Sequence, residues 1–63
     1  MKNFIEVTLK DGTKTMIAAQ TIRAIVSETD GTYIETEFDG KRGSTGIFVI
    51  ESYEKVKQLL NEV

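Results

Sequence analysis

Residues 40–46, GKRGSTG, are the stretch of this chain whose residue types could do chemistry. Lys41 and Arg42 supply adjacent positive charges, Ser44 supplies a hydroxyl, and three glycines leave the main-chain amides accessible. Such a set can contact an anion, because cations and free N–H groups both attract negative charge. Three interpretations are open: a phosphate cradle, a basic hook for nucleic acid, or a long hairpin loop in which glycine supplies backbone freedom.

The order of residues in this segment departs from that of a phosphate-binding loop. Such a loop has the pattern G-x-x-x-x-G-K-[ST] and lies between a strand and a helix. Here the lysine follows the first glycine directly, and the residues after the segment, IFVI at 47–50, are typical of a strand. The free N–H groups of a helix start, which bind anions in such loops, are therefore not expected. Lys41, Arg42 and Ser44 remain the candidate anion contacts.

The rest of the chain lacks the residues that most catalytic and metal sites use. There is no histidine and no cysteine, so the commonest general base and the commonest metal ligands are missing. Ser52 and Lys55 form the one Ser-x-x-Lys pair, but Ser52 is better placed to cap a helix. Glu35 and Glu37 share a strand face that we expect to be solvated. We predict no catalytic residue, no metal, no cofactor and no small-molecule substrate, and hence not an enzyme.

Length and charge narrow the class of protein further. A chain of 63 residues makes one small domain, residues 1–63, with a thin core. Eight Lys and Arg against ten Asp and Glu give a net charge of −2, and the cations are scattered rather than gathered in the basic stripe typical of nucleic-acid binders. No apolar run approaches the length that spans a bilayer, and the N-terminus has no signal-peptide pattern. We therefore expect a soluble, cytoplasmic protein without a membrane span, for which nucleic acid is not the expected partner.

Apolar and polar residues alternate with the period of β-strands along most of the chain. Asp-Gly pairs at 11–12, 30–31 and 39–40 punctuate this pattern and predict hairpin turns. The segment 18–21 is compatible with either a helical turn or a bend. The strands are predicted around residues 5–9, 14–18, 22–26, 33–38 and 47–50.

The last twelve residues change to a helical period. Ser52 is a good N-cap, and Glu54 suits the positive end of the helix dipole. An apolar stripe at helical spacing indicates that the helix docks on the sheet, with at least one of Leu59 and Leu60 buried. The stripe consists of Tyr53, Val56, Leu59, Leu60 and Val63. The predicted fold is α+β: an antiparallel β-meander of four to five strands with one C-terminal amphipathic helix packed on the sheet.

The whole-chain pattern resembles a known family of small bacterial proteins. The residues that carry the resemblance are Ile5-Glu6-Val7-Thr8-Leu9, Gly12, Ile17, Ile22, Ile25, Thr32-Tyr33-Ile34, Gly40 and Val49-Ile50-Glu51-Ser52-Tyr53-Glu54-Lys55-Val56. They resemble the flagellar FlbD/SwrD family of single-domain proteins linked to flagellar function and swarming. The resemblance implies this fold, a non-catalytic accessory role and no active site. The chain departs from the family at Ala18 and Gln20 and in its longer loop at 40–46.

An excess of apolar residues predicts a protein-binding surface. The strand at 47–50 is apolar at both parities, with Phe48 and Ile50 opposite Ile47 and Val49. One helix covers one face, so we expect Phe48, Ile50 and Ile25 to form an interface, with a protein partner or with a second copy in a homodimer. The predicted function is a non-catalytic protein-interaction or accessory module. The alternative is a phage-like or regulatory nucleic-acid-associated protein that uses the loop at 40–46.

Overall fold

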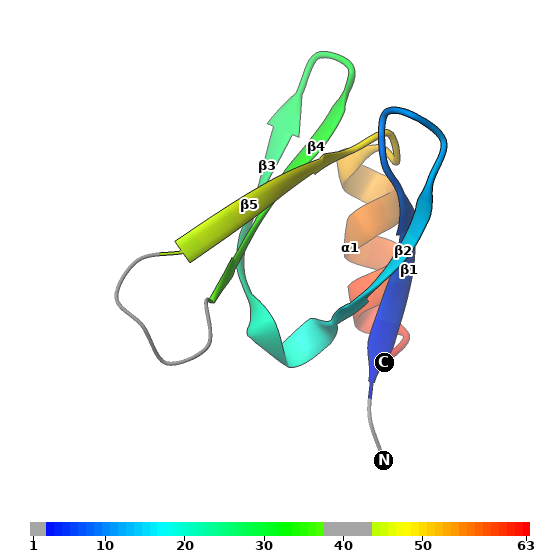
Figure 1. Cartoon of the computed structure of the whole chain (residues 1–63). Coiled ribbons are helices and arrows are strands. Elements are labelled where there is room, and N and C mark those ends of the chain that lie inside the picture. Colours follow the sequence, from blue (N-terminus) through cyan, green and yellow to red (C-terminus); the bar gives the residue numbers. More distant parts are fainter. Residues whose placement is uncertain (1–2, 38–43) are drawn as a thin grey trace.

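The protein folds into five strands and two helical segments, as a computed structural model shows for residues 3–37 and 44–63 (Figure 1). It belongs to the α+β class, with antiparallel strands and a C-terminal α-helix. The elements in chain order are β1 (Phe4–Thr8), β2 (Lys14–Ala18), the 3-10 helix η1 (Ala19–Thr21), β3 (Ile22–Glu28), β4 (Gly31–Glu37), β5 (Ser44–Val49) and α1 (Tyr53–Asn61).

The first hairpin, β1–β2, forms where its Asp-Gly pair predicts it. The turn is closed by main-chain hydrogen bonds from Gly12 N–H to the Leu9 carbonyl at 2.9 Å and from Leu9 N–H to the Thr13 carbonyl at 2.8 Å. Gly12 has a φ of 92°, a backbone conformation that residues with a Cβ rarely adopt. The Thr13 N–H donates to Asp11 Oδ1 at 2.9 Å, which fixes the acidic side chain over the turn.

The strands do not form the single meander that the sequence predicts. They divide into a two-stranded sheet, β1–β2, and a three-stranded sheet in the order β3–β4–β5. The cause lies in η1, which turns the chain between β2 and β3 so that these two strands do not pair. The Thr21 hydroxyl stabilises this turn by donating to the Ala18 carbonyl at 2.8 Å. Of the two readings open for this segment, the helical turn is confirmed.

The second hairpin, β3–β4, turns one residue earlier than predicted. Thr29 and Asp30 occupy the turn, while Gly31 already pairs with Glu28 as the first residue of β4. A Cβ at Gly31 would overlap the Val49 carbonyl of β5, so this glycine permits close approach of two strands.

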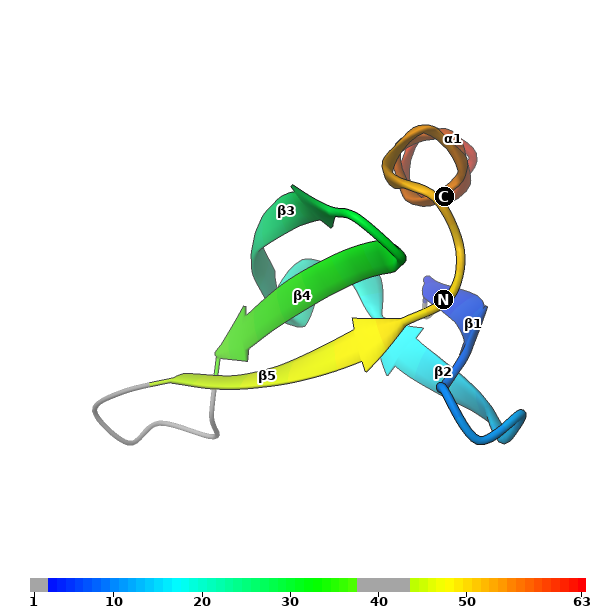
Figure 2. The same cartoon turned by 90° about the horizontal axis from the view of Figure 1, so that it is seen from above.

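The two sheets meet at one end of β5. Leu9 forms an isolated antiparallel bridge with Val49, and the Ile50 N–H donates to the Thr8 carbonyl at 2.9 Å. The sheets therefore touch at this corner and diverge from it, as the view in Figure 2 shows. This arrangement gives the molecule two layers of strands around a small core.

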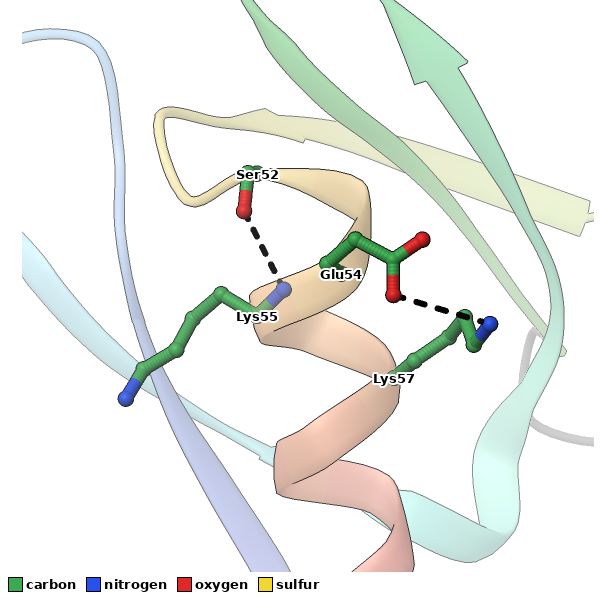
Figure 3. Close-up of polar contacts among 4 residues, drawn as sticks. All are labelled: Ser52, Glu54, Lys55 and Lys57. Atoms are coloured by element: carbon green, nitrogen blue, oxygen red, sulfur yellow. Dashed lines mark hydrogen bonds and ion pairs between the residues drawn. The ribbon is translucent and has the colours of Figure 1, made fainter.

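The helix α1 begins where its capping residue predicts. Ser52 lies in extended conformation and its hydroxyl oxygen accepts a hydrogen bond from the Lys55 N–H at 3.1 Å (Figure 3). Val56 is the fully buried residue of this helix, while Leu59 and Leu60 are half-buried and pack against the core. The helix thus docks through its apolar stripe, but the prediction that Leu59 or Leu60 is buried is wrong, because Val56 is the residue that the contact buries.

The core joins both sheets and the helix. Its fully or almost fully buried apolar side chains come from β1, β4, β5 and α1, and they are Ile5, Val7, Ile34, Val49 and Val56. Seven half-buried apolar residues surround them: Leu9, Ile17, Ile22, Ile25, Ile47, Leu59 and Leu60. Val56 belongs to the same cluster as residues of β1 and of the three-stranded sheet, so α1 contributes to the core that the two sheets share.

Candidate functional site

The structure separates the three residues of the predicted interface. Ile25 pairs with Ile34 and packs against the core cluster, so it faces inward. Phe48 lies on the opposite face of the sheet, paired with Tyr33. Ile50 follows the end of β5 and has 52% of its surface exposed. The placement of Ile25 beside the other two is therefore corrected.

A bulge in β3 explains why the sequence pattern misplaced Ile25. The register of β3 shifts between Ile22 and Ala24, at Arg23, so one extra residue enters the strand. The shift lets Ile22 and Ile25 both pack against the core, although their parities differ. Ala24 and Val26 turn outward instead, and both are exposed.

The outer face of the three-stranded sheet carries apolar and aromatic side chains. Val26, Tyr33 and Phe48 lie side by side on this face and form the Val26–Tyr33–Phe48 row. The register places Val26 opposite Tyr33 and Tyr33 opposite Phe48. Val26 is 45% exposed and Tyr33 is 37% exposed, while Phe48 is half-buried. Sequence parity placed Phe48 on the face opposite Ile47 and Val49, but it gave no indication of Val26, whose orientation depends on the bulge.

Two glycines let the aromatic rings of this row lie close to the sheet. A Cβ at Gly46 would overlap the Tyr33 ring and hydroxyl, and a Cβ at Gly31 would come within 3.0 Å of the Phe48 ring. Each ring therefore extends across a position where a neighbouring strand carries no side chain. Rings held in this way form a smooth, preorganised surface, which lowers the entropy cost of binding.

Charged residues flank the Val26–Tyr33–Phe48 row on different sides. The Lys10 ammonium lies 5.1 Å from the centroid of the Phe48 ring, in the range of a cation–π contact. Glu35 and Glu37 follow Tyr33 along β4 with the same parity, and Glu37 is exposed. The surface thus has an aromatic centre with positive charge at its β5 side and negative charge farther along β4.

A polar cluster centred on Glu51 joins the two sheets just before α1. The Glu51 carboxylate accepts hydrogen bonds from the Thr8 N–H and the Thr8 hydroxyl, both at 2.9 Å. Its main-chain carbonyl accepts from the buried Thr32 hydroxyl at 2.8 Å. Burial raises the pKa of the Glu51 carboxyl, but the hydrogen bonds from Thr8 and the charge of Lys14 lower it by more, so it lies below its usual value of 4.5. This cluster is structural, and no sequence motif indicated it.

An open hollow of about 490 Å³ lies between the β3–β4 turn and the start of α1. Acidic and hydroxyl side chains dominate its lining, which includes Glu28, Asp30, Glu54, Ser52 and the exposed Ile50. Within residues 3–37 and 44–63, no three His, Cys, Asp or Glu residues come together in a group that could hold a metal ion. The hollow therefore offers negative charge without a chelating geometry.

The Ser52 hydroxyl is committed to the helix start. It caps α1 by accepting the Lys55 N–H, as Figure 3 shows, and Lys57 approaches Glu54 at 3.7 Å. Ser52 and Lys55 are thus neighbours through the backbone of one helical turn. The hydroxyl acts here as an acceptor in a cap, which is the structural use that the sequence favoured.

Two of the three candidate anion contacts are residues that the structure does not describe. Lys41 and Arg42 lie outside the described residues, and Ser44 is described only as the first residue of β5.

Among the residues that the structure does describe, no helix is long and apolar enough to cross a membrane. Comparison of the chain with protein-family models, with curated proteins and with solved structures finds no match.

Proposed function

We propose that this chain is a non-catalytic protein-interaction module, an accessory protein of the flagellar and swarming kind that its sequence resembles, acting in the cytoplasm. The observation that carries the proposal is the Val26–Tyr33–Phe48 row. It crosses all three strands of one sheet and is apolar, partly exposed and braced against two glycines. Preorganised aromatic surfaces are the usual centres of protein interfaces.

The charges around this row specify the chemistry of the partner. Glu35 and Glu37 favour a partner surface whose apolar side chains are bordered by lysine or arginine. Lys10, at the other side of Phe48, favours an acidic residue there. The partner is therefore a protein with an apolar centre and opposite charges at its two sides. The nucleic-acid alternative depends on Lys41 and Arg42 and stays a separate prediction.

Genetic complementation in the bacterium that encodes the chain tests this proposal. Deletion of the gene should impair swarming, and the wild-type gene should restore it. Val26→Lys should fail to restore it, because a charge on the β3 end of the row opposes burial in an interface. The matched control is Met16→Lys, since Met16 is 58% exposed on β2 of the other sheet.

Three outcomes separate the parts of the proposal. Swarming restored by the control and not by Val26→Lys supports both the role and the surface. Equal restoration by both variants contradicts the surface. Normal swarming after deletion contradicts the flagellar role.

A further inference from the structure

No strand in residues 3–37 and 44–63 pairs with the outer edge of β3. Among the described residues, β3 pairs with β4 on one side only. Glu28 and Gly31 pair directly across the Thr29–Asp30 turn. In an antiparallel ladder, the N–H and C=O groups of every second residue point toward the paired strand. Those of Glu28, Val26 and Ala24 therefore point toward β4. The N–H and C=O groups of Ile25 and Ser27 therefore point to the open edge. Such groups are a template for one more strand.

The two ends of this edge carry opposite charges. Arg23, at the bulge, is exposed at the beginning of β3, and Glu28 and Asp30 are exposed at its end and in the turn. Among the described residues, the ion pair found is the one between Lys57 and Glu54. Arg23, Glu28 and Asp30 therefore form no ion pair with another described residue. A strand with opposite charges at its two ends complements an antiparallel copy of itself.

We propose that the partner at this edge is a second copy of the chain, which pairs its β3 with this one antiparallel about Val26. In that register Ile25 exchanges main-chain hydrogen bonds with Ser27 of the partner subunit, because both residues point outward. Arg23 then lies opposite Thr29 of the partner subunit, between Glu28 of the partner subunit and Asp30 of the partner subunit. The two-fold axis repeats each contact, as a closed dimer requires.

Pairing at this edge extends the interaction surface already described. The two three-stranded sheets join into one of six strands, and the two Val26 side chains become neighbours on its outer face. The two Val26–Tyr33–Phe48 rows then form one continuous band across the dimer. This inference rests on the proposed function for its premise that the chain acts through protein contacts, but it involves the edge of the sheet rather than its face.

The edge of β2 lacks the features that favour β3. Its residues, Lys14–Ala18, carry one positive charge and no negative charge. Antiparallel pairing of two β2 strands would place Lys14 near Ala18 of the partner subunit, with no ion pair gained. Charge complementarity therefore favours the edge of β3 over that of β2.

Charge reversal combined with sedimentation equilibrium tests the dimer. The wild-type chain should approach twice its monomer mass of 7.1 kDa between micromolar and millimolar concentration. Arg23→Glu and Glu28→Arg should each raise the dissociation constant about tenfold, and the double reversal should restore it. Lys14→Glu, an equal charge change on β2, should leave it unchanged. A monomer at every concentration, or a dimer indifferent to all reversals, would overturn the inference.

Amide exchange gives an independent readout at the edge itself. The Ile25 and Ser27 N–H groups should become protected from exchange as concentration rises, while exposed amides elsewhere should not. Ser27→Pro removes one outward N–H and no bond to β4, so it should abolish the dimer while circular dichroism stays native. A folded Ser27→Pro variant that still dimerises would contradict pairing at β3. If the chain proves monomeric but Val26→Lys still fails in the swarming assay, the inference fails and the proposed function stands.

Discussion

Glu51 connects more of the molecule than any sequence pattern indicated. Its carboxylate binds Thr8 of β1 through two hydrogen bonds, and its carbonyl binds Thr32 of β4. It also directly precedes Ser52, the cap of α1. A single residue thus ties both sheets to the start of the helix.

The low pKa of Glu51 predicts a defined loss of stability in acid. The folded-state pKa lies below the usual 4.5, so the ionised carboxylate stabilises the fold above that pH. This contribution is lost as the pH falls below 4.5 and through the folded-state value. Glu51→Gln should therefore lower the free energy of unfolding by about 1 kcal/mol at neutral pH and by much less near pH 3. Urea unfolding of both proteins at the two pH values measures the difference.

Glu6→Gln is the matched control for this experiment. Glu6 is exposed on β1 and accepts no hydrogen bond among those found in the described residues. Its substitution should change stability little at either pH. A Glu51→Gln effect of the same size at neutral and acidic pH would show that the carboxylate charge is not what stabilises the corner.

At the scale of elements, the docking of α1 depends on Val56. This side chain is fully buried among residues of β1, β4 and β5. Val56→Ala should cost about 2 kcal/mol of unfolding free energy, because it removes buried methyl groups from the core that both sheets and the helix share. Val63→Ala, an identical change at a residue 46% exposed, should cost less than about 0.5 kcal/mol. Equal effects in thermal or chemical unfolding would mean that α1 does not contribute to the core that the two sheets share.

Local patterns predicted individual elements well, because their causes are local. The alternation at Ile5, Val7 and Leu9, the turn at Gly12 and the Ser52 cap each depend on a few neighbouring residues. The division into two sheets was missed because it depends on η1, whose sequence is compatible with a bend as well. The bridge between Leu9 and Val49 joins residues distant in sequence, which no local pattern can indicate.

The outer face of the three-stranded sheet was predicted only in part, because alternation along a strand gives the correct face only where the strand is regular. Parity identified the outward face of Phe48 and that of Glu35 and Glu37, since β4 and β5 pair without interruption. It failed for Ile25 and Val26, because the bulge at Arg23 inserts one residue and reverses the parity of β3 beyond it. An arginine between two apolar residues is a weak signal for a bulge, and only the pairing reveals it.

At the scale of the whole molecule, a thin core leaves much apolar surface outside. A chain of this length buries only about 60% of the surface that it exposes when unfolded. Exposed large apolar residues accordingly occur on both sheets, with Phe4 and Met16 on one and Val26 and Tyr33 on the other. The second pair differs from the first because its row is braced by glycines and extends to Phe48. This difference is why we assign the interaction to the three-stranded sheet.

The balance of charge over the whole molecule predicts no significant affinity for nucleic acid. With a net charge of −2, the chain should bind duplex and single-stranded DNA weakly even at low salt. Replacing Lys41 and Arg42 with alanine should leave both the fold and this weak binding unchanged. Fluorescence anisotropy titration measures the affinity. Tight binding that falls steeply with salt and disappears in the double variant would favour the nucleic-acid alternative.

Photocrosslinking inside the cell tests the interaction surface most directly. A photoreactive phenylalanine analogue at Tyr33 conserves the ring that lies over Gly46, and the same analogue at Phe4 probes the other sheet. We expect one discrete protein adduct from position 33, lost when Val26→Lys is combined with it, and no such adduct from position 4. An adduct of twice the monomer mass identifies a second copy, and a larger one identifies a different protein. No adduct from position 33, or equal adducts from both positions, would contradict the assignment of the interaction surface to the outer face of the three-stranded sheet.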